Sequence, residues 1–194
     1  MTKKEILQAN DALSVLIGTP LRDFGRIGGI LYFNFGDMVE LKGVAMRDEN
    51  NVVLRNEAGE AIFEKFLSGM YELTTMCGMR FICGNDVIFA SGDIFIPSEE
   101  LYNKVGFTWD NFDWHTHGST LFDELLEKHF RKKFDDYIVK SLKAGRFGDL
   151  TITFENDFVL EFFSDTFGGG ESWRFGETAS CESLIVTTKG IATE

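Results

Sequence analysis

The sequence predicts an α+β fold in which a mainly antiparallel, curved β-sheet, built as a meander of hairpins, packs with two principal α-helices. Residues 146–175 alternate apolar and polar side chains in runs separated by turn residues, as antiparallel strands with one buried face require. Residues 6–17 and 121–130 instead carry apolar side chains at helical spacing. Runs of strands with few helical segments between them are typical of α+β proteins.

The strongest strand pattern is a hairpin near the C-terminal end. Every second residue of Leu150–Phe154 is apolar, and residues 158–163 continue the apolar face. Residues 155–157, Glu-Asn-Asp, supply the turn because Asn and Asp tolerate left-handed backbone angles. After a glycine-rich loop at residues 168–170, residues 172–175 resume an extended pattern, and we expect them to continue the same meander.

The N-terminal segment is predicted to be helical. Thr2 and Glu5 have the spacing of a capping box, so the helix should begin there, and Gly18 and Pro20 should end it. Residues 22–29 are interpreted as a glycine-punctuated connector.

A strand, a turn and a return strand are expected next. Residues 31–35 alternate, Gly36-Asp37 resembles a turn, and residues 39–44 form the return strand. Residues 46–67 are polar for most of their length and are interpreted as an insertion or a mobile arm. Within them, the periodicity of residues 61–67 leaves a helical turn and a strand both open.

The middle of the chain is predicted to contain a long strand and a second helix. Alternate residues from Tyr71 to Phe81 share one face of an extended segment, residues 84–86 turn it, and residues 87–97 return and end at a proline. Residues 106–118 form an aromatic loop, after which Ser119 should cap the helix. Beyond the helix we expect a strand at 137–142, then the hairpin, then a last strand at 184–188 and a frayed end.

Length and composition indicate one globular domain, residues 1–194, with 46–67 as the insertion or arm. Hydrophobic residues make up 44% of the chain and phenylalanine occurs 20 times, which excludes a disordered protein. No apolar run of about 18 residues predicts a membrane span, and the N-terminus lacks the pattern of a signal peptide. An odd number of cysteines, three, favours a reducing compartment, so we expect a cytoplasmic protein with buried free thiols.

The charge is strongly negative and unevenly distributed. The net charge is −12, and residues 148–194 hold nine acidic and two basic residues, 2 − 9 = −7. Such a surface repels nucleic acid and anionic lipid and attracts basic partners, although it can also serve solubility alone. The candidate partner-binding acids are Asp149, Glu155, Asp157, Glu161 and Glu171.

Aromatic residues suggest a different class of site, a small-ligand pocket. Its candidate residues are Trp109, Trp114, Trp173 and Arg174. Arg174 and Arg80 each lie within an otherwise apolar strand, where a guanidinium must be paired or reach the surface. For Arg80 we expect an ion pair with Asp93 or Glu161.

Candidate catalytic and metal-binding motifs are weak. His115 and His117 could share one face of a strand with Asp113 nearby, but no third His or Cys has suitable spacing, so no metal is predicted. The glycine-rich segments lack the strand, helix and lysine of a phosphate-binding loop. No nucleophile motif is recognised, so no catalytic residue and no cofactor is predicted, and an enzyme of unrecognised type stays an alternative.

Three segments resemble a widespread set of uncharacterised bacterial proteins: residues 73–81 with Arg80, residues 92–97, and residues 154–175. These proteins share a C-terminal Glu-x-Trp-Arg strand, which here is residues 171–174. Members are small and cytosolic, and some are similar to immunity proteins of polymorphic toxin systems. The resemblance implies no catalytic residues.

Our first hypothesis is therefore a cytosolic, non-catalytic binding protein, of the immunity type, whose acidic face binds a basic, toxin-like protein. The alternatives are the small-ligand-binding protein and the enzyme. We also expect a homodimer through the outer face of the sheet if Val159 and Phe163 are exposed.

Overall fold

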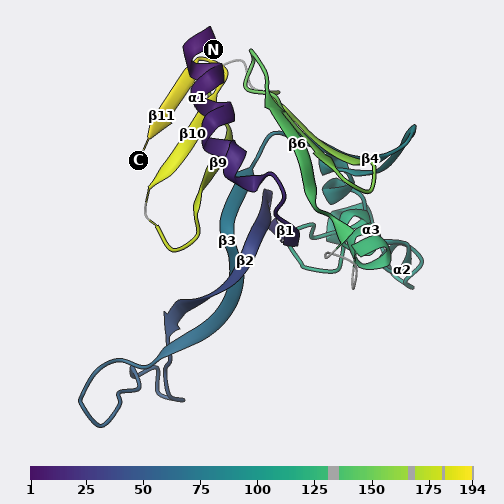
Figure 1. Cartoon of the computed structure of the whole chain (residues 1–194). Coiled ribbons are helices and arrows are strands. Elements are labelled where there is room, and N and C mark those ends of the chain that lie inside the picture. Colours follow the sequence, from purple (N-terminus) through teal and green to yellow (C-terminus); the bar gives the residue numbers. More distant parts are fainter. Residues whose placement is uncertain (131–135, 166–168, 181, 194) are drawn as a thin grey trace.

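The computed structural model describes residues 1–130, 136–165, 169–180 and 182–193. The described chain folds into an antiparallel β-structure with helices at its margins, as the α+β prediction states, but its strands form two sheets (Figure 1). The first sheet has the order β1-β2-β3-β9-β10-β11, with bounds β1 Leu21–Ile27, β2 Ile30–Ala45, β3 Phe63–Thr75, β9 Glu171–Glu177, β10 Ser183–Thr187 and β11 Gly190–Thr193. The second has the order β5-β4-β8-β7-β6, with bounds β4 Gly78–Cys83, β5 Asp86–Ala90, β6 Val139–Ala144, β7 Leu150–Phe154 and β8 Phe158–Phe163.

In the described part of the chain, two helices of similar length and one short helix accompany the sheets, namely α1 Lys3–Leu13, α3 Leu121–Phe130 and α2 Glu99–Tyr102. Short 3-10 turns cover Ser14–Leu16, Ser91–Phe95 and Trp109–Asn111. Helix α1 packs against β6, β10 and β11, and α3 packs against β5 and the 3-10 turn that follows it. Among the described residues, no helix has both the length and the apolar character needed to cross a membrane.

The core is rich in phenylalanine and lies between the sheets. Phe24 of β1 stacks on Phe81 of β4 at a centroid distance of 6.0 Å, and Phe33 of β2 meets Phe162 of β8 edge-on at 5.3 Å. Phe130 of α3 packs edge-on against Phe24 and Phe81. These contacts join both sheets and the second main helix into one core.

Several sequence predictions are confirmed. Thr2 and Glu5 form the capping box of α1, and the β7–β8 hairpin has the predicted strands, with Asp157 at a positive φ of 64° in its turn. Residues 84–86 turn the chain between β4 and β5. Residues 61–67, which were left undecided, contribute the start of β3.

Other predictions are wrong because glycine does not always end a strand. Residues 22–29 are not a connector, since they form β1 and its turn into β2. Gly36 does not reverse the chain. It adopts a φ of +83° at a register shift between Phe35 and Met38, so it makes a bulge within one 16-residue strand.

Sheet membership also differs from the predicted single meander. Residues 71–81 are not one strand, because the chain leaves the first sheet after Thr75 and enters the second at Gly78. Strand β9 likewise pairs with β3 and β10 and not with the β7–β8 hairpin. The end of the described chain does not fray, because β11 pairs with β10.

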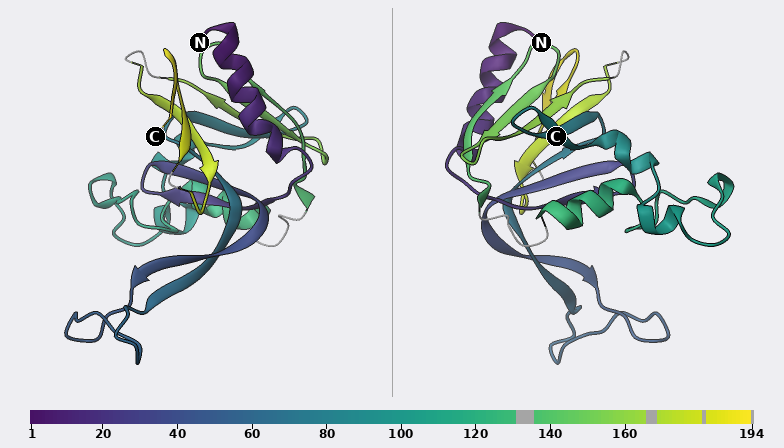
Figure 2. Two further views of the ribbon diagram at one scale, coloured as in Figure 1. Left: turned by 60° about the vertical axis from the view of Figure 1, so that its left-hand side comes forward. Right: turned by 90° about the vertical axis from the view of Figure 1, so that its right-hand side faces the viewer.

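The long β2–β3 hairpin extends beyond the body of the protein as an arm (Figures 1 and 2). We define the arm as residues 38–69. Strand β1 pairs with β2 only as far as Phe35, and β9 pairs with β3 only from Tyr71 onward. The predicted insertion 46–67 therefore begins in the loops at the tip of this arm and ends within β3, and the arm includes strand residues on both sides of these loops.

Candidate binding groove

A row of polar side chains crosses the outer face of the first sheet at the base of the arm. Asp23 of β1 pairs in register with Asn34 of β2, and Asn34 pairs with Glu72 of β3. Directly paired residues of an antiparallel sheet project to the same face. Their chain neighbours Phe24, Phe33 and Leu73 are buried in the core, so the row faces away from it.

This row forms the floor of a groove with a volume of roughly 690 Å³. The arm lines one side, and the turn at Thr178 and Ala179 lines the other. The Thr178 N–H donates to the Met70 carbonyl at 2.9 Å and its hydroxyl donates to Gly69 at 2.6 Å, which fixes the turn against β3. The groove is lined by Asp23, Ile27, Tyr32, Asn34, Glu40, Leu41, Lys42, Phe66, Leu67, Ser68, Glu72, Thr178 and Ala179.

Asn34 is the unusual member of this floor. Its side chain is only 6% exposed, and its Oδ1 has no hydrogen-bond partner among the described residues. A buried amide oxygen without a donor costs free energy, commonly about 1–3 kcal/mol. Asn34 therefore lines the groove with an amide oxygen that the described chain leaves unsatisfied.

The carboxylates beside Asn34 lack cationic partners. Within the described part of the chain, no arginine or lysine forms an ion pair with Asp23 or Glu72. Burial raises the pKa of the Glu72 carboxyl, and burial also raises the pKa of Asp23 more than its hydrogen bonds with Phe24 and Tyr32 lower it. Burial and the negative charges of Asp23 and Glu72 raise the pKa of Tyr32. Lys42 also lines the groove, but within the described chain it forms no ion pair with either carboxylate.

The nearby basic side chains are engaged elsewhere. Lys42 lies over the ring of Phe63 at 5.8 Å, and Lys65 forms an ion pair of 2.6 Å with Glu40. Of the three acids that line the groove, Glu40 therefore has a cationic partner, whereas Asp23 and Glu72 have none among the described residues.

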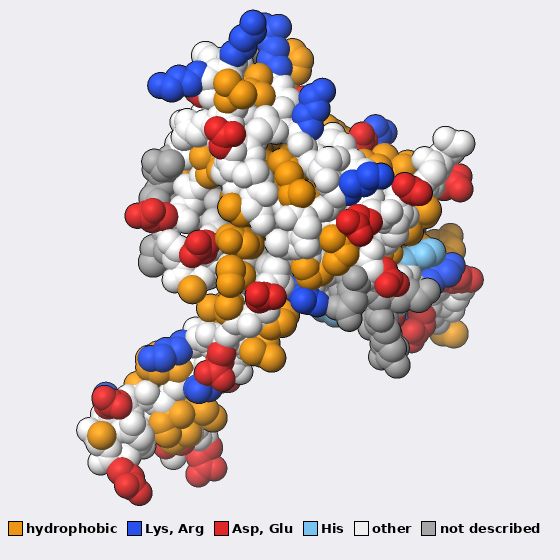
Figure 3. All heavy atoms as spheres, in the orientation of Figure 1, with side chains coloured by type: hydrophobic (Ala, Val, Ile, Leu, Met, Phe, Trp, Pro, Cys, Tyr) orange, Lys and Arg blue, Asp and Glu red, His pale blue; other side chains and the backbone are white. Residues whose placement is uncertain are grey.

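The acidic floor continues into an apolar surface on the arm. Leu41 pairs with Phe66, which is one alternate position beyond Ser68 and three beyond Glu72 on the same face of β3. Phe66 is 49% exposed and Leu67 64% exposed. Figure 3 shows hydrophobic side chains grouped on the arm together with acidic and basic ones, and a further group of basic side chains at the opposite end, where α1 begins.

A buried ion pair holds the rim next to the groove. Arg26 of β1 donates from Nε to Asp123 Oδ1 at 2.8 Å and from Nη2 to Oδ2 at 2.6 Å. Arg26 also donates to the carbonyls of Trp114 and Thr116, at 2.7 and 3.1 Å. Asp123 in turn accepts from Thr120, whose hydroxyl accepts the Asp123 N–H. This pair connects β1, the aromatic loop and the first turn of α3.

The cap of α3 is therefore Thr120, and the prediction of Ser119 is wrong by one residue. The Ser119 hydroxyl donates instead to the carbonyls of Asp113 and Thr116. Burial raises the pKa of Asp123. The hydrogen bonds from Arg26 and Thr120 and the positive charge of Arg26 together lower it by more than burial raises it, so the pKa lies below its usual value.

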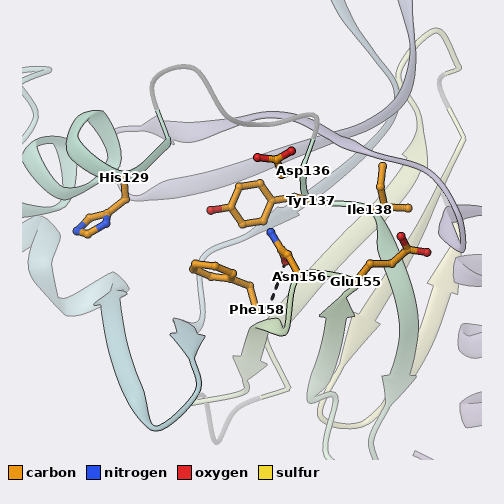
Figure 4. Close-up of a pocket in the computed structure, with 7 residues that line it drawn as sticks. All are labelled: His129, Asp136, Tyr137, Ile138, Glu155, Asn156 and Phe158. Carbon is orange, nitrogen blue, oxygen red and sulfur yellow. Dashed lines mark hydrogen bonds between the residues drawn. The ribbon is translucent and has the colours of Figure 1, made fainter.

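A second hollow lies beside the last turn of α3 (Figure 4). It is lined by His129, Asp136, Tyr137, Ile138, Glu155, Asn156 and Phe158 and has a volume of about 650 Å³. Burial, with smaller effects of Cys83 and Asp136, raises the pKa of Tyr137 to about 12. Among the described residues, no hydrogen bond joins two of the lining side chains. The dashed line in Figure 4 is the Phe158 N–H donating to Asn156.

The predicted partner-binding acids lie at three places. Asp149 and Glu161 line a shallow hollow with Arg80, and the Arg80–Glu161 ion pair of 2.6 Å is one of the two pairs expected for this arginine. Glu155 and Asp157 are exposed in the β7–β8 turn. Glu171, the first residue of β9, pairs with Arg174 at 3.1 Å.

The predicted aromatic pocket is dispersed. Trp173 is fully buried and donates from Nε1 to the Gly148 carbonyl at 2.8 Å. Trp109 is 61% exposed beside Phe107 and Phe112, and Trp114 packs edge-on against Phe95. The structure thus brings none of these indoles together with Arg174 in a described hollow.

The histidine pair does not form a metal centre with Asp113 in the described residues. His115 stacks on Trp114 at 3.6 Å, while His117 lines a hollow of about 440 Å³ that shares Asp23 and Tyr32 with the groove. Asp113 accepts the His115 N–H and the Thr116 hydroxyl, so it shapes the loop.

Cys77 is a buried free thiol, and Cys83 is free and half-buried. Cys181 and Gly168 lie outside the described residues. Phe163 is 43% exposed and its ring covers Gly78, but the predicted homodimer through this face stays a prediction.

Sequence reasoning missed Asp23, Asn34 and Glu72. Asn34 lies between two buried phenylalanines, and Asp23 and Glu72 each precede a buried apolar residue of their strand, which signals an outward-facing position. Their proximity depends on the register of three strands, and the sequence does not supply that register.

No protein-family model, curated protein or solved structure matches the chain. The geometry of the groove and the arm therefore carries the functional argument.

Proposed function

We propose that this protein is a binding protein whose partner is a basic protein that contacts the groove and the adjoining face of the arm. The observation that carries this proposal is the pair of unneutralised carboxylates, Asp23 and Glu72, on either side of an unsatisfied amide oxygen. A cationic partner would supply the missing charge and the missing donor.

The arm adds the apolar component that a specific interface needs. Phe66 is large, exposed and next to the acidic floor, where it pairs with Leu41, and this arrangement resembles the apolar centre and polar rim of protein interfaces. The net charge of −12 would speed association with a cationic protein over a longer range. In its more specific form, we propose a cytosolic immunity-type protein that binds a basic toxin, as the resemblance implies.

Co-purification tests the proposal. The tagged protein is co-expressed with each polypeptide encoded beside its own gene, and a polypeptide of positive net charge is expected to be retained. Retention should weaken between about 0.1 M and about 1 M salt, as the Debye length falls from about 10 Å to about 3 Å. Co-expression should also relieve any growth arrest that the retained polypeptide causes.

A matched pair of variants locates the contact. Phe66→Ser removes an apolar side chain from the arm and should reduce retention, whereas Val105→Ser changes an exposed apolar side chain in the loop after α2 and should not. Retention of no basic polypeptide, or retention that is insensitive to salt, would contradict the proposed function.

A further inference from the structure

The floor of the groove has the acceptor pattern of a site for a cationic side chain. Three acceptor groups lie on three adjacent strands, namely the carboxylates of Asp23 and Glu72 and the Oδ1 of Asn34 between them. Asn34 is 6% exposed, lines the groove and has no hydrogen-bond partner for this oxygen among the described residues. This observation is independent of the charges beside it.

The same chain shows how it satisfies a guanidinium elsewhere. Arg26 donates hydrogen bonds to both carboxylate oxygens of Asp123 and to the carbonyl oxygens of Trp114 and Thr116. The groove presents a comparable set of carboxylate and neutral oxygens, but the described chain places no arginine against it.

The width of the row favours arginine over lysine. Neighbouring strands lie about 4.8 Å apart, so the strands of Asp23 and Glu72 are separated by roughly 10 Å. A planar guanidinium has five N–H donors spread over its fork, whereas an ammonium is a compact and strongly hydrated charge. Leu41 and Phe66 continue the groove with apolar surface that suits the aliphatic part of the side chain.

We propose that the groove binds the guanidinium of an arginine of the partner protein, between Asp23 and Glu72 and with Asn34 Oδ1 as the third acceptor. This inference rests on the proposed function, because the arginine belongs to the basic partner. Beyond the proposed function, the inference states which group of the partner is bound, a guanidinium, and where on this protein it binds.

The test uses the full-length protein and a small probe, so it does not require the partner. N-acetyl-arginine methylamide is titrated into isotopically labelled protein while amide NMR shifts are recorded. We expect saturable shifts at Asn34 and Glu72 and none at Glu155. The citrulline analogue, which is neutral and nearly isosteric, should give no saturable shift, and the lysine analogue should bind several-fold more weakly.

Variants with matched charge changes follow. Glu72→Gln and Asp23→Asn should each weaken binding of the arginine probe by about tenfold or more, because each removes a charged acceptor. Glu155→Gln makes the same change in charge in the β7–β8 turn, away from the groove, and should leave binding unchanged. Thermal unfolding of Glu72→Gln checks that the variant is folded.

The outcomes separate this inference from the proposed function. Equal shifts with citrulline, shifts confined to other residues, or unchanged binding by Glu72→Gln would overturn the arginine site. If a basic polypeptide is retained equally by the wild type and by Glu72→Gln, the arginine site is wrong while the proposed function stands. If the probe binds at the groove but no basic polypeptide is retained, the proposed function fails while the site itself is real.

Discussion

Asp123 and Glu72 are both carboxylates removed from water, but only Asp123 has a cationic partner in the described chain. Asp123 is buried with Arg26, and its hydrogen bonds and the positive charge bring its pKa below the usual value. Glu72 is half-buried without a cation, and burial raises its pKa. The first carboxylate is satisfied within the chain and holds a loop and a helix in place. The second is unfavourable in the free protein, as is typical of groups that serve binding and not stability.

The largest effect is expected from breaking the satisfied pair. Asp123→Asn leaves the Arg26 charge buried and uncompensated, which should lower the free energy of unfolding by about 3–5 kcal/mol. Urea denaturation at neutral pH measures the loss. Asp110→Asn, an exposed acid in the same half of the chain, is the control and should change stability by less than about 0.5 kcal/mol. If both substitutions change the free energy of unfolding by a similarly small amount, the Arg26–Asp123 ion pair does not contribute to stability as expected.

A smaller effect is expected from removing a single partner of Asp123. Thr120→Ala deletes the hydroxyl that accepts the Asp123 N–H and donates to its carboxylate, and it should cost about 1 kcal/mol. Thr120→Ser should restore most of this stability. Ser119→Ala, at the position that the sequence suggested for the cap, should cost less, and the reverse order would argue against the observed cap.

The two carboxylates should also respond to pH in opposite directions. Because the pKa of Asp123 is lowered on folding, its contribution to stability is present above the ordinary aspartate pKa of about 3.9 and is lost as the pH falls below it. Because the pKa of Glu72 is raised, the folded protein binds a proton more readily than the unfolded chain. Stability should therefore fall slightly as the pH rises from about 4.3 through the folded pKa.

Denaturation of the wild type and of two variants from about pH 2.5 to about pH 7 separates these contributions. Asp123→Asn should reduce the loss of stability that the wild type shows at acidic pH. Part of that loss will remain, because hydrogen bonds also lower the pKa values of Glu5 and Asp113. Glu72→Gln should remove the slight fall in stability that is expected as the pH rises above about 4.3. Superimposable profiles would mean that the two environments do not differ as described.

The smallest change in stability is expected from replacing Glu72, the carboxylate without a cationic partner in the described chain. Glu72→Gln should leave stability at neutral pH unchanged or raise it by less than about 1 kcal/mol, because it removes a half-buried charge that has no cationic partner among the described residues. Glu161→Gln, which removes a carboxylate paired with Arg80, should lower it slightly, as for exposed ion pairs. Differential scanning calorimetry compares the two. A clear loss in Glu72→Gln would assign this residue a structural role.

Local features of the fold were readable from the sequence. The β7–β8 hairpin and the capping box of α1 depend on residues close in the chain, and both were predicted correctly. Gly36 was not, because a glycine at positive φ fits a turn and a bulge equally well, and only the partner strand decides between them.

Long-range features were not readable. The short connection at Met76 and Cys77 carries the chain from one sheet to the other, and its composition does not distinguish it from a continuing strand. Arg26 was assigned to a connector because its partner, Asp123, lies 97 residues away. The groove depends in the same way on strand register, so its residues could be recognised as outward-facing but not as neighbours.

The geometry of the arm has a consequence for how the chain is degraded. Its loops lie far from the core, and the strand halves that carry them lack outer neighbours, so a protease should cut first within residues 46–62. Residues 30–35 and 71–75 would still be paired within the body, so the two fragments should stay together after cleavage. A nicked molecule would then keep the acidic floor while losing the continuity of its apolar extension.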